Sequence, residues 1–123
     1  MQALQYQIDV DTEQNLLRAT VQGLLNSQDV IALYQVFTFI GNTHKITRLL
    51  LDFCQSDLAY SSASVVDVSH RLADLIKDFK VARVVNSEDY RQTMIEQVFS
   101  QLDVQLRNFE DRDAGISWLL DEN

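Results

Sequence analysis

The segment ITRLLLDF (46–53) constrains the fold more than any other part of the chain, because three leucines follow one another at 49–51 and Phe53 comes next but one. A strand with one face in water alternates apolar and polar residues, whereas a strand covered on both faces is apolar throughout. This segment therefore predicts a central strand of a layered α/β sheet, with helices packed against it.

The flanking patterns alternate between strand and helix. Two period-2 segments, YQIDV and LRATVQ, are separated by the polar run DTEQN, which predicts an antiparallel hairpin. Apolar residues at helical spacing then follow NSQD, where Asn26 or Ser27 provides an N-cap, and this helix ends near Gly41. The remaining elements are expected at 62–79 (helix), 81–85 (strand), after NSED (helix), 104–109 (strand) and in DRDAGISWLL (a short helix).

This order, β-β-α-β-α-β-α-β-α, predicts an α/β fold with a single mixed β-sheet: a leading antiparallel hairpin, then parallel strands, with about four helices. The 123 residues contain no proline and only three widely separated glycines, so we expect one domain spanning 1–123. In such sheets the functional crevice lies beyond the carboxyl ends of the parallel strands. Three loops leave those ends: CQSDLAYSS, NSED and EDRD.

Charge and composition exclude several classes of partner. A net charge of -8 disfavours nucleic acid and anionic membrane surfaces, which both attract Lys and Arg. No apolar run approaches the ~20 residues that span a bilayer, so we expect a cytoplasmic protein without membrane insertion. The single cysteine, Cys54, cannot form an internal disulfide, and we interpret it as a small buried hydrophobe at the end of a strand.

No residue set indicates catalysis. His44 and His70 have no Cys or His neighbour at ligand spacing, so no metal site is predicted. Glycine-rich phosphate motifs and a G-x-S-x-G elbow are absent from the sequence, so no cofactor is predicted and we expect a non-enzymatic protein. Glu110, Asp111 and Asp113 are interpreted as acids that complement the dipole of the last helix.

The stretch LAYSSASVVD places three serines, Ser61, Ser62 and Ser64, at the start of the second helix. A serine there can cap the helix by accepting a hydrogen bond from an orphan amide. It can equally carry a phosphoryl group or touch a ligand, because free amides and the positive helix end stabilise added negative charge. The residues alone leave both interpretations open.

Across nearly the whole chain the pattern resembles the STAS-type fold of bacterial anti-sigma-factor antagonists, and more closely its SpoIIAA-like branch. The resemblance rests on YQIDVDTEQNLLRATVQGLL, SQDVIALYQVF, RLLLDF, VVDVSHRLADLIKDF and the ending VQLRNFEDRDAGISWLL. It implies a small cytosolic module without established catalysis, used for protein contacts or for apolar ligands held beneath the helices.

The resemblance also implies a phospho-acceptor position. In STAS antagonists a serine preceded by aspartate and followed by Ser-Gly opens the second helix and is phosphorylated by a partner kinase. That serine falls at Ser61 and the next at Ser62, but Tyr60 replaces the aspartate and Ala63 replaces the glycine, while the nearest aspartate is Asp57. Ser61 is therefore the candidate acceptor, with Ser62 the alternative, and Ser62 is the expected cap.

Our hypothesis is a regulatory or protein-interaction module that binds a protein partner through the loop before the second helix. The expected contact surface comprises Asp57, Tyr60, Ser61, Ser62, Ser64, Ser87 and Glu88. The alternative is a carrier of a small apolar ligand or lipid, in a pocket between the sheet and the helices with Tyr34, Phe37, Phe79 and Phe99, unless these aromatics simply fill the core. Formation of a homodimer stays open.

Overall fold

A computed structural model describes residues 4–121 and contains the predicted order of elements. The strands are β1 (Gln5–Asp11), β2 (Leu16–Leu25), β3 (Arg48–Leu58), β4 (Lys80–Val84) and β5 (Gln105–Phe109), and the helices are α1 (Ser27–Thr43), α2 (Ser62–Ile76), α3 (Tyr90–Ser100) and α4 (Arg112–Leu120). None of the helices in this part of the chain combines the length and apolarity needed to cross a membrane.

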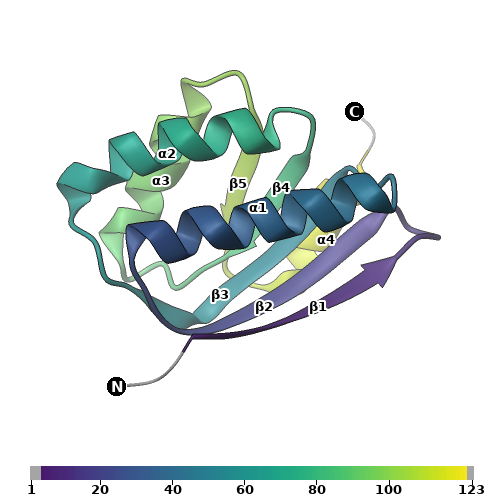
Figure 1. Cartoon of the computed structure of the whole chain (residues 1–123), viewed down its shortest axis with the longest axis horizontal. Helices are drawn as coiled ribbons and strands as arrows, with labels where there is room; N and C mark the ends of the chain where they lie inside the picture. Colours follow the sequence, from purple (N-terminus) through teal and green to yellow (C-terminus); the bar gives the residue numbers. More distant parts are fainter. Residues whose placement is uncertain (1–3, 122–123) are drawn as a thin grey trace.

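The five strands form one sheet in the order β1-β2-β3-β4-β5, as Figure 1 shows. β1 pairs antiparallel with β2, and all later neighbours pair parallel. Successive right-handed crossovers that advance in one direction put their helices on one face, so α1, α2 and α3 cover the same side. α4 follows the last strand and packs on the opposite side (Figure 1). The predicted mixed α/β sheet is confirmed.

The central strand β3 is buried on both faces, as its leucine run predicts. Leu49 and Leu51 belong to the large core beneath α1, α2 and α3, whereas Leu50 packs with Leu119 in the smaller core beneath α4. Helix α4 lies so close to the sheet that a Cβ added at Gly115 would stand 3.0 Å from Leu50 Cδ1. The consecutive apolar positions therefore serve two separate cores.

β3 is longer than the sequence indicated, because it continues through polar residues to Leu58. Thr20 of β2 pairs with Asp52, and Gln22 pairs with Gln55, so β3 carries one extra residue at a bulge. Cys54 lies in this bulge, and its side chain is exposed. The expectation of a buried cysteine is thus wrong, because Cys54 lies at the irregular position of the strand and belongs to neither apolar core.

Local signals at the start of α1 are confirmed. Asn26 is the N-cap, and its side chain accepts from the amide of Asp29 at 2.8 Å while the Asp29 carboxylate accepts from the Asn26 amide. This reciprocal pair is a capping box. By contrast, α2 ends at Ile76, three residues before the predicted end, because Phe79 turns into the core ahead of β4.

Candidate functional site

The candidate site lies at the carboxyl ends of the parallel strands, where β3 leads into α2 and β4 leads into α3. Only Ala59, Tyr60 and Ser61 separate β3 from α2, and we call this segment the Tyr60 loop. Asp57, which the sequence placed in a loop, is an exposed residue of β3 paired beside Leu24. The loop proper is therefore much shorter than predicted.

The serines at the start of α2 differ in role from the expectation. Ser61 is the N-cap by its extended backbone (φ -75°, ψ 162°), yet its side chain accepts no capping hydrogen bond. Its exposed hydroxyl instead lies 3.4 Å from Ser64 Oγ. Ser62 is half-buried and already helical, so the prediction that Ser62 is the cap is wrong, because a cap residue needs a non-helical backbone.

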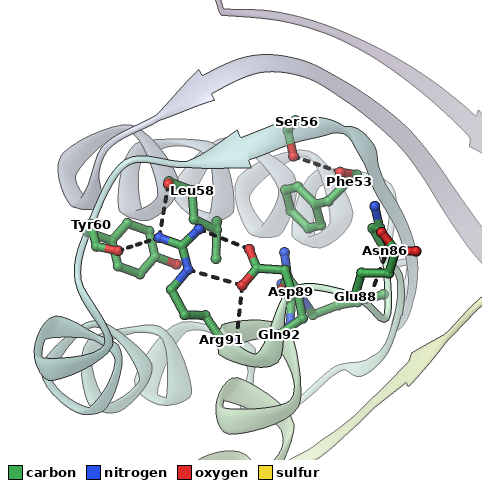
Figure 2. A network of polar contacts seen from close by, with 10 residues as sticks. Phe53, Ser56, Leu58, Tyr60, Asn86, Glu88, Asp89, Arg91 and Gln92 are labelled. Carbon is green, nitrogen blue, oxygen red and sulfur yellow. Dashed lines mark hydrogen bonds and ion pairs between the residues drawn. The ribbon is translucent and has the colours of Figure 1, made fainter.

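An arginine of α3 holds the Tyr60 loop from below, as Figure 2 shows. Arg91 Nη1 donates to the backbone carbonyl of Leu58 at 3.1 Å and to that of Tyr60 at 2.9 Å. Its Nε and Nη2 donate to the two carboxylate oxygens of Asp89, each at 3.0 Å. We call this arrangement, Asp89 and Arg91 with the carbonyls of Leu58 and Tyr60, the Arg91 latch.

In the latch, Asp89 and Arg91 each stabilise the charged form of the other. The hydrogen bonds from Arg91 lower the pKa of Asp89, and the Asp89 carboxylate in turn raises the pKa of Arg91. Asp89 also accepts from the Arg91 amide as the N-cap of α3. The sequence indicates the NSED turn but not the role of Arg91, because no local pattern shows that its side chain reaches back to β3.

The other two predicted contact residues, Ser87 and Glu88, lie exposed in the turn before Asp89. Glu88 donates its amide to Asn86 Oδ1 at 3.0 Å, which stabilises the turn. The structure joins this turn to the Tyr60 loop through the latch, which the side chains of Ser87 and Glu88 do not enter. Tyr60, Ser61, Ser62 and Ser64 form the contiguous part of the predicted surface.

The aromatic residues of the carrier hypothesis are packed into the core. Tyr34, Phe37, Phe79 and Phe99 are each at most 5% exposed, and the rings of Tyr34 and Phe37 meet edge-on with centroids 6.0 Å apart. The cavity beside Tyr34 and beneath Tyr60 has a volume of about 10 Å³, roughly the space for one water. This geometry favours the interpretation that the aromatics fill the core.

A second arginine, Arg83, lies in the wall of that cavity and is only 4% exposed. Its guanidinium donates to Asn108 Oδ1 at 3.1 Å and to Gln92 Oε1, and it stands 5.3 Å from the centre of the Phe53 ring. The pattern VARVV gave no sign that this arginine is buried, because a charged side chain in an apolar strand is usually the solvent-facing one.

The metal-ligating and nucleophilic groups weighed in the sequence do not form a catalytic arrangement among the described residues. Residues 4–121 contain no cluster of three or more His, Cys, Asp or Glu suited to a metal ion. Partial burial, followed by the Asp52 carboxylate, raises the pKa of the Cys54 thiol, which makes it a poorer nucleophile. Asp111 is the N-cap of α4 and accepts from the Ala114 amide at 2.8 Å, as its position at a helix start indicated.

Comparison with known proteins identifies the architecture. No protein-family model and no curated protein sequence matches the chain. A crystal structure of an uncharacterized DUF3478-family protein from Shewanella loihica PV-4, described as having a SpoIIAA-like fold, superposes with a TM-score of 0.62 over 97% of both chains. The chain has a SpoIIAA-like fold. At 19% sequence identity this likeness extends to the fold alone, in agreement with the resemblance found in the sequence.

Proposed function

We propose that this SpoIIAA-like protein is a non-enzymatic, cytoplasmic regulatory module that binds a protein partner through the Tyr60 loop and the first turn of α2. The observation that carries the proposal is Ser61. Its hydroxyl is exposed and takes no part in capping, although its backbone occupies the cap position of a fifteen-residue helix. A serine whose side chain is not needed for the helix is available for recognition or modification.

The Arg91 latch supports a binding role because it fixes the loop before any partner arrives. Two hydrogen bonds from Arg91 hold the carbonyls on either side of Ala59, and the Ala59 amide donates to Leu25 O at 2.7 Å. A pre-ordered loop loses less conformational entropy on binding than a mobile one.

Two exposed apolar side chains belong to the helices that adjoin the loop and the latch. Tyr90 opens α3 next to Arg91 and is 64% exposed, and Val66 in the second turn of α2 is 47% exposed. Aromatic residues are enriched in protein interfaces, since they supply a large contact area at low entropy cost. Phosphorylation of Ser61 would add nearly two negative charges at the positive end of α2 and alter such a surface directly.

The test is an affinity capture from the native lysate, with the chain as bait. We expect the wild-type chain to retain a protein that the Ser61→Asp/Ser62→Asp double variant loses. Ser117→Asp is the matched control, because Ser117 is an exposed serine of α4 on the opposite face of the sheet. Equal capture by all three baits would contradict the proposed surface. Mass spectrometry of the chain isolated from its host reports whether Ser61 is phosphorylated.

A further inference from the structure

Arg83 presents an uncompensated charge inside the protein. The groups that hydrogen-bond to its guanidinium, the Gln92 and Asn108 amides and the Tyr34 phenol, carry no negative charge. Among residues 4–121 no carboxylate forms an ion pair with Arg83, and its Nε is buried without a hydrogen-bond partner. A guanidinium keeps its charge in proteins, and an unpaired buried charge costs several kcal/mol, so a partner for this group is expected.

The neighbouring hydroxyls do not supply the missing negative charge. Tyr34 and Tyr60 both interact with Arg83, but burial raises the pKa of each phenol despite the opposing effect of the arginine. Both phenols are therefore protonated near pH 7 and carry no negative charge. Asp89, the acid that interacts with Tyr60, forms its ion pair with Arg91 and not with Arg83.

The cavity that Arg83 lines has the features of a small anion site. Its polar lining consists of Arg83, the Tyr34 and Tyr60 phenols and the hydroxyl-bearing Ser69, and the remaining wall is apolar. Low polarity strengthens the attraction between a guanidinium and an anion. Every lining residue except Tyr60 is at most 6% exposed, so access from solvent is at Tyr60.

We propose that Arg83 forms the centre of a buried binding site for one small monovalent anion of about halide size, reached from solvent past Tyr60. The unpaired Nε donates to the anion, and the adjacent hydroxyls complete its coordination. The volume of about 10 Å³ limits the occupant to a single small group and excludes bulky organic anions unless Tyr60 moves. The proposal does not depend on the partner surface, because Arg83 lies in the core.

The experiment measures urea unfolding of the full chain in gluconate, an anion too large for the cavity, while chloride or bromide replaces it at constant ionic strength. We expect saturable stabilisation, with the unfolding constant falling about 100-fold when the anion reaches 100 times its Kd. Chlorine NMR line broadening, reversed by bromide, reports binding directly. An unfolding constant equal in gluconate and in every small anion would show that a water occupies the cavity, and it would overturn the proposal.

Two variants and one control test whether the anion binds at Arg83 and enters past Tyr60. Arg83→Met should abolish the saturable anion effect, whereas Arg107→Met should retain it, because Arg107 is an exposed arginine of the adjacent strand β5. Should Arg83→Met fail to fold, Tyr60→Ala keeps the arginine and widens the entrance. This variant should then bind acetate, which the wild-type chain rejects. Identical anion selectivity in Tyr60→Ala and the wild type would count against entry at Tyr60.

Discussion

Replacing Arg91 with alanine should release the Tyr60 loop while leaving the rest of the fold in place. The substitution removes both hydrogen bonds to the carbonyls of Leu58 and Tyr60 and leaves Asp89 without its bidentate partner. The affected groups connect α3 to the end of β3, so the loss falls on the link between these elements. The helices and the sheet keep their own apolar cores.

The magnitude follows from the geometry. Hydrogen bonds to a charged group contribute about 1.5–3 kcal/mol each. The Arg91 side chain is 26% exposed and that of Asp89 27%, so water can solvate the groups left behind and reduce the loss. We therefore expect a decrease of about 2 kcal/mol in the free energy of unfolding for the two bonds together. For a domain of this size that corresponds to about 8 °C in Tm.

Urea unfolding measures the global effect, and hydrogen exchange measures the local one. The amide of Ala59, which donates to Leu25 O, should exchange about 30-fold faster if local opening becomes 2 kcal/mol easier. The matched control is Arg71→Ala, which breaks an Arg–Asp pair of α2 whose side chains are 66% and 71% exposed and should cost less than about 0.5 kcal/mol. Equal stability and equal Ala59 exchange in both variants would refute the latch.

Three further outcomes are expected. Gly115→Ala should destabilise the chain by about 1–3 kcal/mol in urea unfolding, because the new methyl group stands 3.0 Å from a leucine methyl group of β3; a neutral result would mean that α4 shifts freely. Asp111→Ala should cost about 1 kcal/mol through loss of a helix cap, whereas Ser61→Ala should be nearly neutral, since its hydroxyl makes no cap bond; equal costs would contradict this assignment. The pKa of Asp89 is lowered in the folded state, so its contribution is complete above the unfolded pKa of about 3.9 and is lost as pH falls through the lower folded value. Stability should thus fall less between pH 5 and pH 2 in Asp89→Asn than in the wild type, and parallel profiles would disprove the coupling to Arg91.

Strands and helices were predictable where the pattern of neighbouring residues indicates which faces of a segment are buried or where a helix begins. The leucine run at 49–51 indicated a strand covered on both faces, and the Asn26 cap needs only residues of its own turn. The end of β3 was not predictable in this way. Its residues Gln55, Ser56 and Asp57 are polar, and they are strand because β2 extends alongside them. Pairing with a neighbouring strand overrode the weak local preference.

The predicted topology indicated where the candidate site lies but not the role of each residue in it. The carboxyl ends of parallel strands are the expected place for function, and the serine-rich helix start does lie there. The roles of the serines differed from the prediction. The N-cap is the last residue with a non-helical backbone, and the sequence does not show whether that residue is Ser61 or Ser62. Which of them meets a partner stays a prediction.

The sequence by itself determined the order of elements, the mixed sheet and the burial of β3, since apolar periodicity is a property of neighbouring residues. Only the tertiary structure decided which polar groups meet. Arg91 reaches carbonyls 31 and 33 residues away, and Arg83 reaches Asn108 across 25 residues. Such contacts depend on crossover, register and side-chain reach together, and no local pattern encodes that combination. The two arginines that organise the site therefore became visible only once the chain was folded.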